Sequence, residues 1–277
     1  SAEGQAARRQ LAIGVLALVG LAGSVAILVR QGVLSVEAVT SAFSWVYLIV
    51  VIAFFTWLFM AGQWTKEERK RLIVIVVLFA GAAVFWSAFE QAASTLNLFA
   101  AQNTRNSIFG WTFPSSWFQS VNALMIIIFA PVFAWIWISL GKRDPSSPAK
   151  FAFGLVSVGL GFVVMVGAAQ ASANGVLVSP MWLVLTYLLH TIGELSLSPV
   201  GLSSMTKLAP DRVKGMMMGV WFLAASVGNL IAGGVLRFYA DFTLPQVFGA
   251  VAAFAIIAGL VMFALVLPIK RMMARTD

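Results

Sequence analysis

Eight long apolar runs dominate the sequence and set the strongest limit on its fold. An α-helix needs about 20 apolar residues to cross the hydrocarbon core of a bilayer, and each run is close to that length or longer. Hydrophobic residues make up 61% of the 277-residue chain and charged residues only 10%, whereas a soluble domain carries about 25% charged residues. The sequence therefore predicts an all-α membrane protein with eight transmembrane helices, at residues 11–29, 43–62, 72–101, 117–141, 151–173, 178–207, 213–239 and 246–268.

The basic residues alternate between the connections of these predicted helices. All of the 18 Lys and Arg residues except Arg30, Arg105 and Arg237 fall in the N-terminal segment, in the second, fourth and sixth connections, or in the C-terminal segment. Connections rich in Lys and Arg stay on the cytoplasmic side of a membrane. Both ends of the chain are therefore predicted to face the cytoplasm, and the net charge of +8 is explained without a nucleic-acid partner.

The first two predicted helices differ in polarity from the other six. Residues 11–29 and 43–62 contain no acidic or amide side chain, whereas the later helices contain every deep acid and most of the glycines. We therefore divide the chain into residues 1–65, with two peripheral, lipid-exposed helices, and residues 66–277, a six-helix bundle. The opening SAEGQAARRQ has no Met and no obvious cleavage site after it, so we expect the interior of a longer chain, or a trimmed one, rather than a signal peptide.

One apolar run, LVLTYLLHTIGELSLSPVGLSSMTKLAP at residues 183–210, carries a polar stripe. His190, Glu194 and Ser198 follow one another at intervals of four residues, which places them on one helical face. Pro199 removes a backbone donor, so we expect a kink or a local opening beside them. His190, the one histidine of the chain, is either a second proton site or a neutral hydrogen-bonding residue near the outer end of its helix, and we favour the second interpretation.

A second deep acid lies in the third run, within FAGAAVFWSAFEQAASTLNLFAAQN. Trp86, Glu90 and Ser94 again share a helical face. Glu90 and Glu194 are the only acids deep in any predicted span, and ionisable residues at that depth cost about 2.5–3.5 kcal/mol on insertion scales. Such isolated carboxylates are typical of proton relays or of sites for a cationic substrate group. The plainer interpretation is a hydrogen bond or ion pair that joins two helices.

Two amides and one tryptophan are weaker candidates. An amide within a span often serves as an interhelical hydrogen bond, an interpretation about as good as a functional one for Asn122 and the favoured one for Asn229. Trp221 is more easily explained by packing than by a role in a pocket. Gly215 and Gly219 form a GxxxG pattern, which permits a close approach of another helix at that point but is common in membrane bundles.

Several classes of function find no residues to support them. The chain has no cysteine and a single histidine, so a zinc or copper site is not expected. The sequence contains no nucleophile–base–acid set and no glycine-rich phosphate loop. We therefore expect neither an enzyme nor a protein that needs a bound cofactor.

Three segments, FWSAFEQAASTLNLFA, LHTIGELSLSPVGLSSMTKLAP and MMMGVWFLAASVGNLIAG, together resemble the C-terminal half of bacterial proton-dependent oligopeptide transporters (the POT or PTR family), a branch of the major facilitator superfamily. The resemblance extends over essentially the whole chain. It implies that the first two helices are the linker pair that bacterial members insert between their halves, and that the remaining six are helices seven to twelve. It also implies a partner that is missing from this sequence, the N-terminal six-helix half.

The same resemblance implies roles for individual residues. Glu90 resembles the seventh-helix carboxylate of proton coupling. Glu194 resembles the tenth-helix glutamate that, together with an asparagine matching Asn122, holds the amino terminus of the peptide. The remaining candidates resemble positions that line the substrate pocket: Ser198, Trp86 and Trp221.

The implied function is symport of di- and tripeptides with protons across the cytoplasmic (inner) membrane, with the proton as coupling ion and no cofactor. This chain would supply the C-terminal half of the site. Two alternatives stay open. A relative of this family could carry another substrate, such as an amino acid, nitrate or a drug, and a non-transporting membrane scaffold would use its acids only to join helices.

Overall fold

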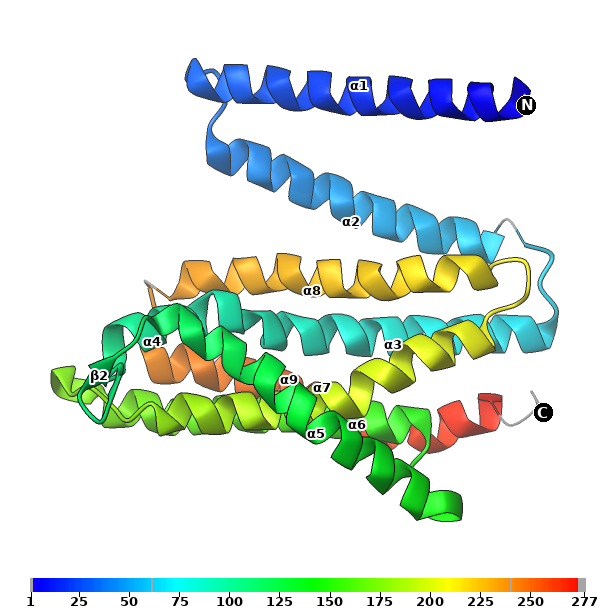
Figure 1. The fold of residues 1–277 in the computed structure, drawn as a ribbon. Coiled ribbons are helices and arrows are strands. Elements are labelled where there is room, and N and C mark those ends of the chain that lie inside the picture. Colours follow the sequence, from blue (N-terminus) through cyan, green and yellow to red (C-terminus); the bar gives the residue numbers. More distant parts are fainter. Residues whose placement is uncertain (1, 61, 240, 274–277) are drawn as a thin grey trace. The chain divides into compact units, whose positions relative to one another are not determined.

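The computed structural model describes residues 2–60, 62–239 and 241–273 and is drawn in Figure 1. The chain divides into two compact units, an N-terminal unit, Ser1–Leu58, and a C-terminal unit, Phe59–Asp277. Within the described ranges, eight helical stretches are long and apolar enough to cross a membrane. The predicted class, an all-α protein with eight membrane helices, is therefore confirmed.

The N-terminal unit is built from α1 (Ala2–Arg30) and most of α2 (Val36–Met60). Large apolar side chains of both helices are exposed, among them Leu16, Trp45 and Ile52. Helices that present apolar side chains to their surroundings suit a lipid environment. This exposure suits helices that face lipid, while their peripheral position and their identification as a linker pair stay predictions.

The C-terminal unit holds the other six membrane spans. Its long helices are α3 (Lys66–Phe89), α5 (Phe118–Leu140), α6 (Ser147–Ala171), α7 (Met181–Leu208), α8 (Met217–Phe238) and α9 (Leu244–Met273). Shorter elements complete it: α4 (Thr95–Asn103), the strands β1 (Ser107–Ile108) and β2 (Trp111–Thr112), and the 3₁₀ turns η1 (Glu90–Ala93), η2 (Ser115–Trp117), η3 (Gly141–Arg143), η4 (Ala173–Gly175) and η5 (Lys214–Met216). In Figure 1, α3 runs alongside α8, and α6 packs most extensively against α9 and α7.

The third span is interrupted where a continuous helix was expected. Residues 72–101 were predicted as one helix, but α3 ends at Phe89, η1 follows, and Ser94 takes a non-helical conformation (φ −119°, ψ −96°) before α4 begins. The local opening expected beside Pro199 in the sixth span is not seen, because α7 continues through Pro199 to Leu208; a kink at that point stays a prediction. The break therefore lies beside Glu90 rather than beside Glu194, and buried side-chain hydrogen bonds hold it, as described below.

Close packing at the centre of the C-terminal unit depends on glycine. A Cβ atom added to Gly193 on α7 would lie 2.8 Å from the carbonyl oxygen of Gly154 on α6, and one added to Gly154 would lie 2.9 Å from the carbonyl oxygen of Gly193. The two backbones can approach this closely only because neither residue has a side chain. The close approach that Gly215 and Gly219 permit is not used within the described part of the chain, since a Cβ at either position would meet nothing within 4 Å beyond its own stretch of backbone. A GxxxG pattern permits contact but does not create the partner helix.

The connection between α4 and α5 forms a small hairpin at the predicted outer side. Ser107 pairs with Thr112 and Ile108 with Trp111, and the two turn residues, Phe109 and Gly110, both have positive φ, as hairpin turns of the primed type require. Aromatic rings gather around the hairpin: Trp111 lies 5.2 Å from Trp117 and 5.9 Å from Phe113. Exposed aromatic rings of this kind suit a membrane–water interface.

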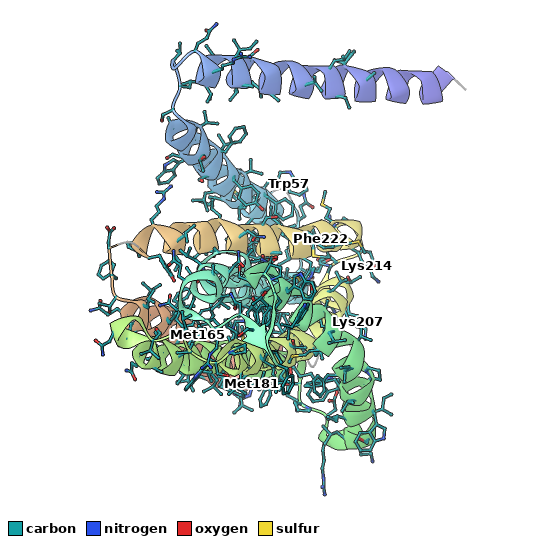
Figure 2. All side chains as sticks on the ribbon, turned by 60° about the vertical axis from the view of Figure 1, so that its left-hand side comes forward. Trp57, Met165, Met181, Lys207, Lys214 and Phe222 are labelled. Atoms are coloured by element: carbon teal, nitrogen blue, oxygen red, sulfur yellow. The ribbon has the colours of Figure 1, made fainter. Side chains whose placement is uncertain are left out.

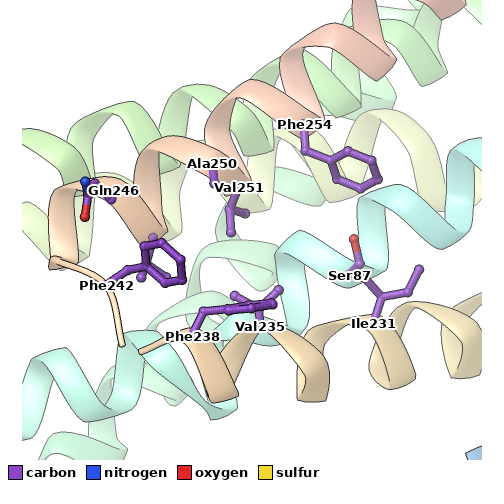
Figure 3. A pocket seen from close by; sticks show the side chains of 10 residues that line it. Ser87, Ile231, Val235, Phe238, Phe242, Gln246, Ala250, Val251 and Phe254 are labelled. Atoms are coloured by element: carbon purple, nitrogen blue, oxygen red, sulfur yellow. The ribbon is translucent and has the colours of Figure 1, made fainter. Parts of the chain in front are cut away.

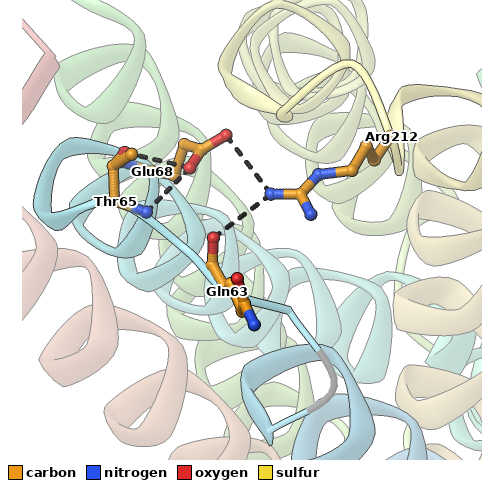
Figure 4. Close-up of polar contacts among 4 residues, drawn as sticks. All are labelled: Gln63, Thr65, Glu68 and Arg212. Carbon is orange, nitrogen blue, oxygen red and sulfur yellow. Dashed lines mark hydrogen bonds and ion pairs between the residues drawn. The ribbon is translucent and has the colours of Figure 1, made fainter.

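At the other end of the unit, the start of α3 is joined to the connection between α7 and α8 (Figure 4). The Thr65 hydroxyl accepts a hydrogen bond from the Glu68 N–H (3.2 Å), and the Glu68 carboxylate accepts one from the Thr65 N–H (2.8 Å), which completes a capping box. Arg212 lies 3.9 Å from the Glu68 carboxylate, donates to the Gln63 carbonyl (3.4 Å) and covers the Trp64 ring at 4.6 Å. These contacts hold two predicted cytoplasmic connections together.

Lysines from the sixth predicted connection and from the C-terminal segment, both predicted to be cytoplasmic, gather at that same end. Lys207 and Lys214, which lie near one another in Figure 2, line one cavity of about 830 Å³ together with Lys270. They come from the end of α7, from η5 and from the end of α9. The fold thus brings together basic residues that the alternation of charge assigns to one side of the membrane.

The glycine contact between α6 and α7 makes a stability prediction. Gly193→Ala should lower the melting temperature of the purified protein in detergent, because the new methyl group forces two backbones apart, and overpacking of this kind costs about 1–3 kcal/mol. Gly249→Ala on α9 is the matched control, since its Cβ would meet only a Val166 methyl group at 3.9 Å, an ordinary contact. Alanine favours a helix over glycine by about 1 kcal/mol at both positions. Equal melting temperatures for the two variants would contradict the packing argument.

Candidate functional site

A hydrogen-bonded cluster joins α5 to α7 within the membrane-spanning part. The Asn122 amide on α5 donates to the Glu194 carboxylate (3.1 Å) and to the Thr191 hydroxyl (3.0 Å), both on α7. Thr191 in turn donates to the Tyr187 carbonyl (2.8 Å), which leaves its oxygen lone pairs free to accept from Asn122. Glu194 is half-buried, and the hydrogen bond from Asn122 fixes the direction of its carboxylate.

Glu90 lies close to this cluster. It is the first residue of η1, at the break between α3 and α4, and is half-buried. Its carboxyl group is near enough to that of Glu194 for the two to interact electrostatically. The fold therefore brings the two deep acids, about a hundred residues apart in the sequence, within electrostatic range of each other. Any cation or proton that reaches one of them alters the field at the other.

Two further predicted site residues have buried polar atoms without a partner in the described structure. These atoms are the indole nitrogen of Trp86 and the hydroxyl oxygen of Ser198. Trp86 lies one turn before Glu90, with its ring edge-on to those of Phe85 and Phe89 at 5.6 and 5.2 Å. Buried polar groups are almost always hydrogen-bonded, so each of these two is available to a ligand or to water.

Trp221 and Asn229 on α8 are placed differently. Trp221 is 5% exposed and packs edge-on against Phe151 at 6.4 Å, and a Cβ added to Gly201 would meet its ring at 2.2 Å. This placement gives Trp221 a packing role, and its role in a pocket stays a prediction. Asn229 is exposed and makes no hydrogen bond to the described residues, so the interhelical hydrogen bond expected of it is not formed among them.

His190 is fully buried between α6 and α7. The rings of Phe162, Tyr187 and Phe89 surround it at 5.2, 6.3 and 6.1 Å. Neither ring nitrogen has a hydrogen bond of good geometry within the described chain, although the Val158 carbonyl is close enough to attract a ring N–H. His190 and Glu194 therefore share a helical face but have different surroundings, one an aromatic enclosure and the other the contact with α5.

Two residues of this region, Thr191 and Gln91, make hydrogen bonds that the sequence did not indicate. Thr191 shares the Asn122 amide with Glu194. Its position three residues before Glu194, on the same helical face, is the signal that could have identified it. Gln91, next to Glu90, makes four hydrogen bonds in the buried break of the third span, and no local pattern indicates them.

A separate cavity of about 480 Å³ lies between α3, α8 and α9 (Figure 3). Its wall is mostly apolar and includes Ile231, Phe238, Phe242 and Phe254, with Ser87 from α3. None of the predicted site residues lines this cavity. The candidate site residues, among them the two acids on η1 and α7 and the amide on α5, therefore lie apart from this cavity.

Comparison with known proteins places this arrangement in a family. Residues 6–253 match the model of the POT family (PTR2). The chain is 43% identical over 95% of its length to the peptide transporter YePEPT of Yersinia enterocolitica and 33% identical over 82% to a di-/tripeptide transporter of Lactococcus lactis subsp. cremoris. It spans about half of these relatives, 53% and 46% of their lengths.

A solved structure agrees with the sequence matches. The crystal structure of a peptide transporter POT in complex with sulfate superimposes with a TM-score of 0.86 at 38% identity, over 96% of this chain and 54% of the other. The fold, the order of the spans and the family model therefore point to one conclusion. The chain belongs to the POT family, the proton-dependent oligopeptide transporters of the major facilitator superfamily.

Proposed function

We propose that this chain supplies the C-terminal part of a proton-coupled symporter of di- and tripeptides. The observation that carries the proposal is the cluster of Asn122, Thr191 and Glu194, with the Glu90 carboxyl group close by. Relatives that are named as peptide and di-/tripeptide transporters support the same substrate class. The coupling ion is the proton, and no cofactor takes part.

Glu194 is the proposed partner of the peptide ammonium group. One of its oxygens accepts from Asn122, while the other, Oε1, makes no hydrogen bond to the described residues. A carboxylate that is oriented in this way offers a directed acceptor to an N–H⁺ donor, and charge-assisted hydrogen bonds are roughly twice as strong as neutral ones. Ser198 and Trp86 would add polar contacts through their unpartnered atoms, and Trp221 would line the pocket from α8.

Glu90 is the proposed proton carrier. Two neighbouring carboxylates repel each other when both are charged, and this repulsion is removed when one binds a proton or an ammonium group. A proton on Glu90 and a peptide ammonium on Glu194 would neutralise both acids at membrane depth and favour closure around the substrate. Loss of the proton toward the cytoplasm would restore the repulsion, weaken substrate binding and favour release.

The complete transporter requires a second half. Half of a facilitator holds only one side of the substrate site, and alternating access needs one half to rock against the other. We therefore propose an N-terminal six-helix half as the partner of residues 66–277, with residues 1–65 as the inserted linker helices. The protein would lie in the cytoplasmic membrane with both ends of this chain on the cytoplasmic side.

Substitution of Glu194 tests recognition of the ammonium group. In the complete protein, Glu194→Gln should raise the KM for dialanine about tenfold or more, because a neutral amide replaces the charge that pairs with the ammonium group. The discriminating measurement is competition by N-acetyl-dialanine, which lacks that group. The unsubstituted protein should prefer dialanine strongly, and Glu194→Gln should lose this preference. An equal preference in both proteins would exclude Glu194 as the ammonium partner and would direct attention to another substrate of the family.

Substitution of Glu90 tests coupling. In proteoliposomes with an inward proton gradient, Glu90→Gln should abolish gradient-driven dialanine uptake while counterflow exchange continues, because the amide cannot carry a proton. Glu67→Gln is the matched control, since it removes a carboxylate whose surface pair with Lys70 (3.0 Å) is worth at most about 1 kcal/mol. No driven uptake by the unsubstituted protein would reject peptide symport and leave the scaffold or another substrate. Loss of both uptake and exchange in Glu90→Gln would assign the residue to substrate binding instead.

A further inference from the structure

Gln91 is the polar centre of the break in the third span. Its side chain is completely buried. The amide nitrogen donates to the carbonyl oxygens of Ser87 on α3 (3.1 Å) and Ala232 on α8 (3.3 Å). The amide oxygen accepts from the hydroxyl groups of Thr95 (2.9 Å) and Ser94 (3.2 Å). Gln91 therefore uses both N–H groups and both lone pairs of its amide, which is its full capacity.

These four hydrogen bonds connect three elements at one point. Thr95 begins α4, Ser94 is the residue at which the helical path is lost, and Ala232 belongs to α8, which packs directly on the turn before the break. At that contact a Cβ added to Gly228 would lie 2.5 Å from the Trp86 Cβ and 2.8 Å from the Ser87 nitrogen. A short 3₁₀ turn has weaker backbone hydrogen bonds than an α-helix, so the Gln91 side chain supplies the contacts that keep this turn in one conformation.

We infer that Gln91 is a positioning residue for Glu90, fixing the η1 turn from which the Glu90 side chain extends. The inference rests on the proposed function, in which Glu90 carries the coupled proton. Glu90 and Gln91 are consecutive residues of one short turn, so any rearrangement of that turn changes the position of the Glu90 carboxyl group. A side chain that holds α8 to this turn also links the position of the proton carrier to that helix.

The elements around Glu90 contribute few ionisable residues. The elements that pack against η1 are α3, α4 and α8. α4 contains no ionisable residue, and the charges of α3 lie in its first turns. α8 contains one, Arg237, five residues beyond the Ala232 contact. From α7, Glu194 interacts with Glu90, and His190 contacts the neighbouring Phe89 ring. Gln91 itself is uncharged, so its replacement by an uncharged residue changes geometry and polarity without adding a new charge.

Three variants of the complete protein test the inference. Gln91→Met keeps a long, flexible side chain but removes all four hydrogen bonds. Thr95→Val removes only the bond from the Thr95 hydroxyl and is the milder variant, in case Gln91→Met does not fold. Ser157→Ala is the matched control, because it removes a nearly buried interhelical bond, from the Ser157 hydroxyl on α6 to the Leu189 carbonyl on α7 (2.8 Å), and neither residue bonds to the η1 turn.

The primary measurement does not depend on transport. A hydrophobic carbodiimide reacts with protonated carboxyl groups, and mass spectrometry of the Glu90 peptide gives the labelled fraction at each pH. Gln91→Met should move the midpoint of this curve by roughly half a pH unit or more, Thr95→Val should move it less, and Ser157→Ala should leave it in place. The ratio of gradient-driven uptake to counterflow should fall about tenfold in Gln91→Met, since small displacements of a catalytic group have effects of at least that size.

The outcomes separate three interpretations. An unchanged labelling midpoint in Gln91→Met and Thr95→Val, with a melting temperature lowered as in Ser157→Ala, overturns the inference and leaves Gln91 a purely structural residue. A shifted midpoint together with a selective loss of driven uptake supports it. A shifted midpoint in a protein whose unsubstituted form shows no proton-driven uptake supports the positioning of Glu90 by Gln91 but rejects the proposed function.

Discussion

A bilayer offers no water to a backbone group that has lost its hydrogen bond. The rest of this structure depends on how the third span satisfies its backbone groups where its helix is interrupted. Within the membrane, N–H and C=O groups must find partners inside the protein. The span nevertheless leaves the α-helical path at Glu90–Ser94. Gln91 is buried at this point with its amide fully bonded, and one of its partners lies on α8. The break is thus stabilised by tertiary contacts. The position of Glu90, which extends from the break, therefore depends on α8.

The sequence predicted the features of this fold that depend on composition and missed those that depend on distant contacts. Eight spans followed from the length of the apolar runs, because the thickness of a bilayer is a fixed physical scale. The break at Glu90 was missed because FEQAAS contains neither Pro nor Gly, and because the bond from Gln91 to Ala232 joins residues 141 positions apart. The local opening expected at Pro199 does not form, since α7 tolerates the single hydrogen bond that a proline removes.

The candidate site shows the same division between local and distant information. Helical spacing correctly placed His190 and Glu194 on one face, but it could not indicate that one would be enclosed by aromatic rings and the other would meet α5. The pairing of Asn122 with Glu194 came from the resemblance to a family and not from any pattern in the residues. The proximity of Glu90 to Glu194 is a property of the assembled bundle. Two isolated acids in separate apolar runs indicate function, but only the fold makes them a pair.

Packing around these acids indicates where movement is least costly. Gly154 and Gly193 bring the backbones of α6 and α7 so close that neither helix can slide without a clash. A close-packed interface of this kind has discrete arrangements rather than a continuous range of them. The η1 turn is joined to α8 by the bond from Gln91 to Ala232, beside an equally close contact of α3 and α8 at Gly228. We therefore expect α6 and α7 to move as one body and η1 to follow α3 and α8. Glu90 then belongs to one pair of helices and Glu194 to the other. Under the proposed function, a shift of one pair against the other would change the distance between the two carboxyl groups, and with it their repulsion.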